Sequence, residues 1–486
     1  MIAIALSVPG RGSAQEAEFQ AFDEYVSAAV RDWNVPGLAI AVVRNDSLVF
    51  ASGYGVLDVG EPTPVDAHTR FAIGSTTKAM TTAALALLVD EGRLDWDDRV
   101  IDHLPEFQLH DPWVTRELTV RDLLTHRTGL PGTDLYWGVL DYDIAEMMRR
   151  LRYVEPVSSF RSHWEYQNVV YAIAGVIVER LSGMPWHEFV RTRLFMPLGM
   201  TETEPLDAGI LREPNVAVPH DATNDSLHTV PKRSVDAVAS VGSVWSSVTD
   251  MSKWLRFMLD SARVDTTRLI TAETFSEIVT PVIHADMATY PALELSKPHG
   301  FSYALGWFIQ DYAGDVVWMH TGSINGMSAI VGLLPDRRFG VVVLANRDHT
   351  ELRHALMYRA FDLAADNPPR DWSAELREFF EREHRVATTP PADVTPPALP
   401  LDRYAGTYAS PAYGAVRVTH AGEALQIAIG DGPARTLGHR DFEMFRTRDD
   451  ASGNSFTVTF VPDGAGHIAA VRIFGATFER ERERGR

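Results

Sequence analysis

A proline-rich segment divides this sequence into two parts with different residue patterns. Residues 386–400 read VATTPPADVTPPALP. Proline has no backbone N–H and a fixed φ, so such a run continues neither a helix nor a central strand and is typical of a linker. The chain of 486 residues is also too long for one ordinary core. We therefore expect a large domain at 16–370, a helix and linker at 371–400, and a small domain at 401–486.

The part before the linker mixes helical and strand patterns. Residues 38–44 and 48–52 are apolar runs joined by Asn45-Asp46, a pair typical of hairpin turns. Residues 303–346 have strand character, with a turn at 335–340. Apolar periodicity and end signals, including Gly92 and a capping box at Ser247-Val-Thr-Asp250, predict helices at 18–33, 76–91, 169–182, 186–195, 251–259 and 373–385. This pattern indicates a mixed α/β (α+β) domain.

The part after the linker has a different residue pattern, typical of short β-strands. Apolar residues alternate with polar ones, as at Phe456, Val458 and Phe460. Glycine-rich turns at 421–422, 430–432 and 463–466 separate the runs. About eight short strands of this kind predict a small closed antiparallel β-barrel.

Composition excludes several classes of function. The net charge of −20 argues against a nucleic-acid partner, because phosphate binding needs a basic surface. The absence of cysteine excludes a thiol nucleophile, disulfides and thiolate metal sites. No His-Glu-x-x-His, Gly-x-Ser-x-Gly, phosphate loop or dinucleotide motif occurs. We therefore expect neither a metal nor another cofactor.

The N-terminus resembles the end of an export signal. Residues 2–8 are apolar, and small residues follow around Ala14, although a basic first segment is missing. Residues 1–15 are thus expected to be a signal remnant of a periplasmic or secreted protein, with a cytoplasmic protein as the alternative. No other run has the eighteen or so apolar residues of a membrane span.

Ser75-Thr-Thr-Lys78 is the first candidate for catalysis. A spacing of three at a helix start places both side chains on one face. The lysine can hold the serine hydroxyl or, if burial lowers its pKa, accept the hydroxyl proton. The alternative is a capping serine beside a surface lysine. A chance match is uncommon here, because the chain has only four lysines.

Two further strings carry groups suited to the same chemistry. Tyr166 is a candidate base if nearby cations lower its pKa, and Asn168 is a candidate to hold a substrate carbonyl or Lys78. In the string His320-Thr321-Gly322-Ser323, glycine at a strand edge allows a substrate backbone to approach. The N–H groups of Ser323 and Ser75 would then form an oxyanion hole.

The order and spacing of these strings resemble those of class C β-lactamases and penicillin-binding serine hydrolases. The phrases LLTHRTGLP at 123–131, PLGM at 197–200 and GMS at 326–328 match as well, and the resemblance covers about residues 20–365. It implies an antiparallel sheet flanked by helices, with an inserted all-helical subdomain. The segment from Arg403 onward loosely resembles the lipocalin-like barrel of some relatives.

The resemblance also implies a role for each matched residue. Ser75 becomes the nucleophile, Lys78 its activator and Tyr166 the general acid/base. The remaining matches form the substrate-binding part: Asn168 contacts substrate and Lys78, and His320, Thr321, Gly322 and Ser323 line the active-site strand. Tyr136 and Trp137 fall where relatives shape an acyl pocket, although both are equally compatible with a core.

One departure affects the choice of substrate. True β-lactamases of this type carry lysine where this chain has His320, which is mostly neutral at pH 7 and titrates near 6.5 if unperturbed. This favours a hydrolase that forms an acyl-enzyme on ester or amide substrates, including short D-amino-acid peptides. The alternatives are a β-lactamase or D-Ala-D-Ala carboxypeptidase, and a penicillin or cell-wall peptide sensor that stays acylated.

Overall fold

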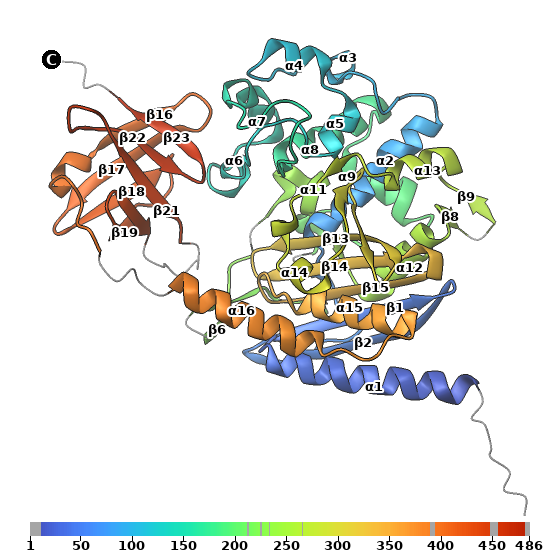
Figure 1. Ribbon diagram of the computed structural model, residues 1–486. Helices are drawn as coiled ribbons and strands as arrows, with labels where there is room; N and C mark the ends of the chain where they lie inside the picture. Colours follow the sequence, from blue (N-terminus) through green and yellow to red (C-terminus); the bar gives the residue numbers. More distant parts are fainter. Residues whose placement is uncertain are drawn as a thin grey trace, which may run out of the picture.

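The computed structural model describes residues 11–210, 213–223, 226–232, 234–264, 266–388, 394–447 and 455–481. The predicted signal remnant at 1–15 lies mostly outside these ranges, and helix α1 (Arg11–Asp32) already includes residues 11–15. Figure 1 shows a large helix-and-sheet body and a separate barrel, with the helix α16 (Trp372–Thr388) reaching from one toward the other. Helix α16 therefore continues to Thr388, into the proline-rich segment 386–400 that was predicted as a linker.

A nine-stranded antiparallel sheet forms the centre of the body. Its order is β10-β11-β12-β13-β14-β15-β1-β2-β3, so the N-terminal strands pair with the last strand of the body. In the middle of the sheet, Ile40 faces Val343. The central strands are buried on both faces, which explains their continuous apolar sequences. The strands are β1 (Gly37–Arg44), β2 (Ser47–Asp58), β3 (Glu61–Pro64), β10 (Ile283–His284), β11 (Phe301–Tyr303), β12 (Phe308–Tyr312), β13 (Asp315–Ile324), β14 (Met327–Leu334) and β15 (Phe339–Ala345).

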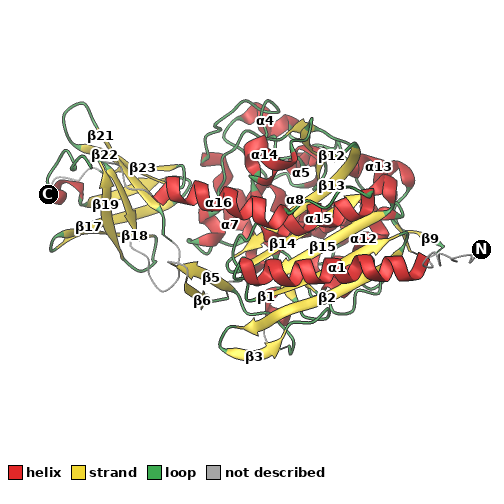
Figure 2. Ribbon diagram, turned by 60° about the horizontal axis from the view of Figure 1, so that its bottom comes forward, coloured by secondary structure: helices red, strands yellow, loops and turns green. Residues whose placement is uncertain are grey.

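Three helices cover one face of this sheet. α1, α15 (Leu352–Ala365) and α16 lie side by side over it (Figure 2). Phe22 of α1, Leu356 of α15 and Trp372 of α16 are completely buried in one cluster with Ile40 and other sheet residues. This layer packs the first helix of the body, α1, beside its last two, α15 and α16, and burial of their apolar side chains stabilises the contact.

The opposite face carries the helical subdomain and the helices beneath it. The predicted helix at 76–91 is α2 (Thr77–Asp90), and the pattern at 186–195 is split into a short α-helix and a π-helical turn. The helices on this side are α3 (Val100–His103), α4 (Pro112–Glu117), α5 (Val120–Leu124), α6 (Leu135–Gly138), α7 (Ile144–Arg150), α8 (Asn168–Ser182), α9 (Trp186–Val190), α10 (Asp207–Ile210), α11 (Ala239–Gly242), α12 (Val248–Leu259) and α13 (Ala272–Val279). Three small two-stranded ribbons connect them: β4 (Phe71–Ala72) with β7 (Trp245–Ser246), β5 (His220–Thr223) with β6 (Ser226–Thr229), and β8 (Arg263–Val264) with β9 (Thr267–Arg268). The short α14 (Ala292–Ser296) packs instead with α15 and α16, in the buried cluster that contains Leu356 and Trp372.

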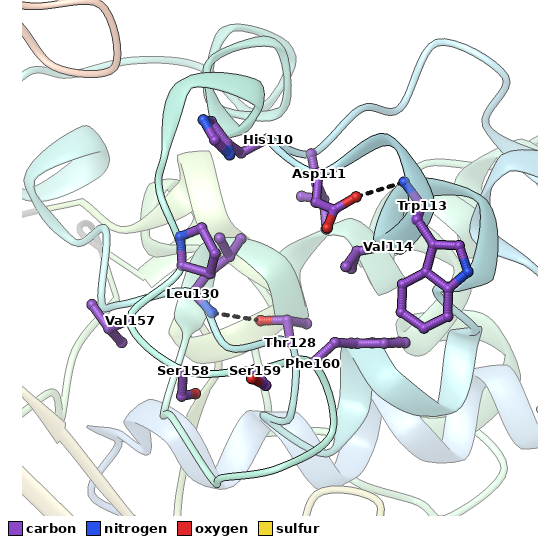
Figure 3. Close-up of a pocket in the computed structure, with 12 residues that line it drawn as sticks. His110, Asp111, Trp113, Val114, Thr128, Leu130, Val157, Ser158, Ser159 and Phe160 are labelled. Atoms are coloured by element: carbon purple, nitrogen blue, oxygen red, sulfur yellow. Dashed lines mark hydrogen bonds between the residues drawn. The ribbon is translucent and has the colours of Figure 1, made fainter.

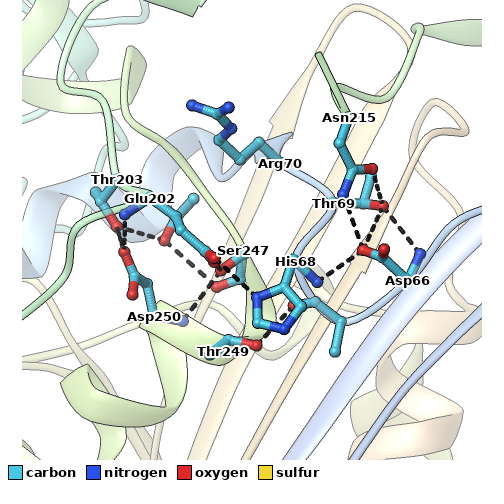
Figure 4. A network of polar contacts seen from close by, with 12 residues as sticks. Asp66, His68, Thr69, Arg70, Glu202, Thr203, Asn215, Ser247, Thr249 and Asp250 are labelled. Atoms are coloured by element: carbon cyan, nitrogen blue, oxygen red, sulfur yellow. Dashed lines mark hydrogen bonds and ion pairs between the residues drawn. The ribbon is translucent and has the colours of Figure 1, made fainter. Parts of the chain in front are cut away.

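Ser247 caps α12, which therefore begins about one turn earlier than predicted. Its hydroxyl accepts a hydrogen bond from the Asp250 N–H at 3.1 Å. The Asp250 carboxylate accepts hydrogen bonds from the Glu202 N–H at 2.7 Å and the Thr203 hydroxyl at 2.9 Å. His68 contacts Glu202 at 2.7 Å, and Figure 4 shows these groups converging at the helix start. The network ties three distant chain segments together.

The C-terminal part is a closed barrel of eight antiparallel strands, as predicted. Its interior contains Tyr408, Val416 and Phe460, all almost completely buried. The strands are β16 (Gly406–Ser410), β17 (Gly414–Ala421), β18 (Ala424–Ile429), β19 (Arg435–Asp441), β20 (Met444–Thr447), β21 (Thr457–Pro462), β22 (Ile468–Ile473) and β23 (Ala476–Arg480).

One end of the barrel contacts the helical subdomain. Arg150 at the end of α7 donates hydrogen bonds to the carbonyls of Pro411 and Ala412, at 3.2 and 3.1 Å. The Tyr136 ring lies 5.1 Å from the Tyr413 ring. Within the described ranges, no single helix is long and apolar enough to cross a bilayer; only the bent pair of α8 and the segment Trp186–Phe195 meets those criteria together.

Candidate active site

Ser75 lies in a short 3₁₀ turn that leads into α2. The turn needs glycine at its first position, because Gly74 has a φ of +51°. A Cβ atom on Gly74 would lie 2.7 Å from the backbone nitrogen of Ser323. The start of α2 and the end of β13 are therefore in direct backbone contact.

Lys78 is completely buried, and three oxygen atoms surround its ammonium group. Nζ lies 2.9 Å from Ser75 Oγ, 2.8 Å from Asn168 Oδ1 and 3.3 Å from the Val241 carbonyl. Burial lowers the pKa of Lys78 to about 7, and the negative charge of Asp134 opposes this shift. The buried position excludes the alternative of a surface lysine. At neutral pH a substantial fraction of Lys78 is an uncharged amine.

Tyr166 contacts the same serine from another direction. Its hydroxyl donates a hydrogen bond to Ser75 Oγ at 2.9 Å. The sequence interpretation required cations to lower the pKa of this phenol, but burial instead raises the pKa well above its usual range. The Lys78 ammonium nitrogen, 4.9 Å from the ring centroid, does not outweigh the burial. Tyr166 is therefore a protonated donor at neutral pH.

Asn168 connects this group to an acid that the sequence patterns did not identify. Its Nδ2 donates to both carboxylate oxygens of Asp134, at 3.1 and 3.2 Å. These bonds fix the amide so that Oδ1 faces Lys78. Asp134 belongs to no recognisable string, so only the folded chain shows the contact.

Gly322 brings the active-site strand against the serine. A Cβ atom at this position would lie 1.9 Å from the Ile73 carbonyl oxygen and 3.0 Å from the Ser75 nitrogen, so no larger residue fits without movement of the backbone. Arg353 on α15 donates to the Gly322 carbonyl at 2.8 Å and to Ser323 Oγ at 2.7 Å. These contacts hold the Ser323 backbone beside that of Ser75, where the oxyanion hole was predicted.

His320 is on the predicted strand but is buried and makes no described contact with Ser75. Its Nδ1 lies 2.6 Å from the Thr321 carbonyl, so Nδ1 donates and Nε2 accepts from the Tyr303 hydroxyl at 2.9 Å. Burial, followed by the charge of Lys78, lowers the pKa of His320 to about 3, far below the unperturbed value assumed from sequence. Thr321 Oγ1 lies 2.7 Å from the Tyr290 hydroxyl. His320 is thus a neutral group in the wall of the site.

His126 is a second buried histidine, from the LLTHRTGLP phrase. Its Nδ1 accepts a hydrogen bond from the Gln167 N–H at 3.1 Å, and its carbonyl accepts one from the Glu165 N–H at 2.7 Å. Its ring lies 4.3 Å from the Tyr166 ring. The phrase therefore positions the tyrosine, a role that its sequence alone did not indicate.

The two aromatic residues predicted near an acyl pocket, Tyr136 and Trp137, lie in different environments in the structure. Tyr136 is completely buried between Tyr142 and Tyr413. Trp137 is partly exposed, lines a cavity beside the barrel, and donates through Nε1 to Asp134 at 3.0 Å. Only Trp137 thus reaches open space near the site.

Another cavity, of about 580 Å³, lies within the helical subdomain (Figure 3). Its lining includes Trp113, Val157 and Phe160, and it shares no lining residue with the site around Ser75. Among the described residues, no group of three or more histidine, aspartate or glutamate side chains could hold a metal ion.

The antiparallel sheet, its flanking helices and the Ser-Lys-Tyr constellation define a protein with the β-lactamase/transpeptidase-like fold. The β-lactamase family model matches residues 22–365, and the chain belongs to this family. Residues 390–486 match a second model, described only as a domain of unknown function.

Two fungal hydrolases are among the most similar curated relatives. The unguisins hydrolase UngD of Aspergillus violaceofuscus is 28% identical, covering 91% of this chain and 83% of that protein. The UngD′ hydrolase of Aspergillus campestris is 30% identical, covering 81% and 76%. The protein Flp of Staphylococcus aureus is 25% identical over 67% of this chain and 63% of its own length.

Solved structures share the fold at lower sequence identity. The octameric penicillin-binding protein homologue from Pyrococcus abyssi has a TM-score of 0.64 at 20% identity, covering 95% of this chain and 99% of that one. SurE has a TM-score of 0.60 at 22% identity over 96% and 100%. A class C β-lactamase from Rhodobacter sphaeroides has a TM-score of 0.58 at 21% identity over 71% and 99%.

Proposed function

We propose that this chain is a serine hydrolase that cleaves ester or amide substrates, including peptides, through an acyl-enzyme at Ser75. The observation that carries the proposal is the pair of contacts on one hydroxyl oxygen. Lys78 Nζ and the Tyr166 hydroxyl both lie 2.9 Å from Ser75 Oγ. A base and an acid placed on the same nucleophile are what acyl transfer requires.

The two neighbours divide the proton transfers between them. The uncharged amine of Lys78 accepts the Ser75 proton as Oγ forms its bond to the substrate carbonyl carbon. The carbonyl oxygen gains the negative charge and accepts hydrogen bonds from the N–H groups of Ser75 and Ser323. When the bond to the leaving group breaks, Tyr166 gives its proton to the leaving atom and receives the one held by Lys78. Water then releases the acyl group by the same transfers in reverse order.

The names of two relatives support a hydrolase, and the neutral His320 supports substrates without a carboxylate. Two relatives are named as hydrolases of unguisins, and SurE has a structure with D-Leu. At the position where a β-lactamase has a charged lysine, His320 stays neutral because burial lowers its pKa to about 3. We therefore rank esters, amides and D-amino-acid peptides above penicillins, and keep a β-lactamase as the second candidate because of the fold it shares with a class C enzyme.

Labelling with a fluorophosphonate tests the nucleophile directly. We expect one label per chain, mapped to Ser75 by peptide mass analysis, and none in Ser75→Ala. A label on another serine, or folded protein without a label, contradicts the proposal. A time course with nitrophenyl esters, D-amino-acid amides and nitrocefin then separates the functions. Steady turnover indicates an enzyme, whereas a burst of one equivalent without turnover indicates a sensor.

A further inference from the structure

A cavity of about 520 Å³ lies between the helical subdomain and the barrel. On the body side its wall is formed by the segment around α6 and by Asn325, and on the barrel side by residues of β18, by Arg435 of β19 and by described residues next to the neighbouring strands. The volume falls in the range of ordinary small-molecule sites. The lining residues are Gly132, Asp134, Leu135, Trp137, Gly138, Val139, Asn325, Ile427, Ile429, Gly432, Pro433, Arg435, Ser455, Phe456 and Phe474.

Chain topology places these barrel residues at one open end. In an antiparallel barrel, alternate connections lie at the same end, so the connections after β16, β18 and β22 lie at the end where Ser455 and Phe456 lead into β21. Pro411 and Tyr413 belong to the first of these connections, and they contact Arg150 and Tyr136. The cavity is therefore enclosed by an end of the barrel that is attached to the body.

The cavity also adjoins the catalytic groups on two sides. Asp134 lines it and holds Asn168, whose amide oxygen contacts Lys78 at 2.8 Å. Asn325 lines it from the turn after β13, two residues beyond Ser323. A substrate bonded to Ser75 thus has the cavity beside it, which makes part of that substrate the natural occupant.

We propose that this cavity binds a bulky apolar side chain or alkyl chain on the acyl part of the substrate. The proposal rests on the function proposed above. Trp137, Val139, Ile429 and Phe456 provide an apolar wall, which favours removal of such a group from water. The leaving group must lie beside Tyr166, its proton donor, so the acyl part extends toward Asn168 and the cavity.

Gly138 offers a way to fill the cavity without removing a contact. It lines the cavity, has no left-handed backbone conformation, and a Cβ there would meet no atom within 4 Å. We expect Gly138→Phe to lower kcat/KM for p-nitrophenyl octanoate about tenfold and to leave p-nitrophenyl acetate within about twofold of wild type. Phe456→Ala, which removes the opposite wall, is expected to lower the octanoate-to-acetate ratio as well.

Gly464→Phe is the matched control. Gly464 also faces open space, but it lies in the connection between β21 and β22, at the other end of the barrel. We expect this variant to keep the wild-type ratio. If Gly138→Phe and Phe456→Ala both keep the wild-type ratio, or if the control changes it equally, the assignment of the cavity is overturned.

A second measurement separates this proposal from the proposed function. Fluorophosphonates with octyl and methyl chains label Ser75 without turnover, so their relative rates report the cavity even when hydrolysis is slow. We expect the octyl preference of wild type to fall about tenfold in Gly138→Phe. An unchanged preference overturns the cavity assignment alone. No labelling of Ser75 by either reagent overturns the proposed function.

Discussion

Lys78, whose ammonium group is buried, is the residue on which the chemistry of the site depends most. Burial penalises its charged form and lowers the pKa to about 7. Below that pH the folded protein holds a protonated lysine that cannot accept the Ser75 proton. We therefore expect kcat/KM for an uncharged ester to rise with pH up to about 7 and to level off above it. The measurement is a pH profile with p-nitrophenyl acetate, and a profile without such a rise contradicts Lys78 as the base.

The lowered pKa of Lys78 also reduces the free energy of unfolding, and the size of this reduction depends on pH. In the unfolded chain a lysine keeps its proton up to a pKa of about 10.4, so between pH 7 and that value the unfolded state binds more protons. The penalty is therefore complete below pH 7 and declines as pH rises, by at most about 1.4 kcal/mol per pH unit. We expect urea unfolding to show Lys78→Met more stable than wild type at pH 6.5, with a smaller difference at pH 9. Lys297→Met, on the surface, is the control and is expected to show no such pH-dependent difference.

Short strings in the sequence predicted most of the residues that meet around Ser75. The structure brings Lys78 to Ser75 as the spacing of three at a helix start predicts, and it brings Tyr166 and Asn168 to the same place, as the family resemblance implied. Asp134 and Arg353 could not be predicted, since each reaches the site only through tertiary packing. The same reason applies to the pKa of Tyr166, whose direction depends on burial rather than on sequence neighbours.

Among the structural elements, the loop after α5 has the clearest positioning function. It accepts backbone hydrogen bonds from the chain that carries Tyr166, as in the bond from the Glu165 N–H to the His126 carbonyl. Gln167 extends this contact, because its Nε2 donates to the Pro131 carbonyl at 2.6 Å. The segment 126–131, about forty residues earlier in the chain, thus fixes the position of Tyr166, which lies just before the start of α8.

His126→Phe tests this positioning. The ring shape remains, but the Gln167 N–H loses its acceptor, and an unsatisfied buried N–H costs about 1–3 kcal/mol. We expect a lower free energy of unfolding by roughly that amount and a fall in kcat for p-nitrophenyl acetate with little change in KM. His163→Phe is the control, because His163 is exposed and bonds only the adjacent Ser162 among its described contacts. Lost stability with unchanged kcat contradicts a positioning role and leaves a structural one.

Element boundaries followed the sequence patterns where local signals are strong. The strand-rich region, the barrel and the helix at 169–182 were predicted within a few residues. Three helices are longer than predicted, α1 and α12 at their starts and α16 at its end. At α12 the reason is the cap, because the Ser247 hydroxyl accepts a hydrogen bond from the Asp250 N–H and the helix begins directly after Ser247. The split of the pattern at 186–195 into α9 and a π-helical turn has no visible sequence signal.

At the scale of the whole molecule, the attachment of the barrel decides the shape of the cavity. Arg150 carries much of this attachment: besides its bonds to Pro411 and Ala412, its guanidinium lies 4.5 Å from the Tyr142 ring centroid and pairs with Glu146. The sequence predicted the barrel but not this contact, because no pattern tells which end of a barrel faces a neighbour.

Arg150→Ala is expected to loosen the attachment. Loss of two hydrogen bonds from a charged donor, partly exposed, weakens the interface by about 1–2 kcal/mol. We expect faster hydrogen exchange in the segment between β16 and β17 and a higher KM for p-nitrophenyl octanoate. Arg152→Ala is the control, since Arg152 donates to the Arg149 carbonyl in its own segment. Equal exchange in both variants contradicts the assigned attachment.

The position of β1 has a consequence for how this protein is made. β1 lies between β2 and β15, and Leu38 pairs with Ala345, which the ribosome adds about three hundred residues later. At 5–20 residues per second the wait is on the order of 15–60 s. During that time the edge of β1 that will meet β15 has unpaired N–H and C=O groups, a known template for aggregation. We expect the yield of soluble protein to depend on translation speed and on chaperones that hold the nascent N-terminal strands.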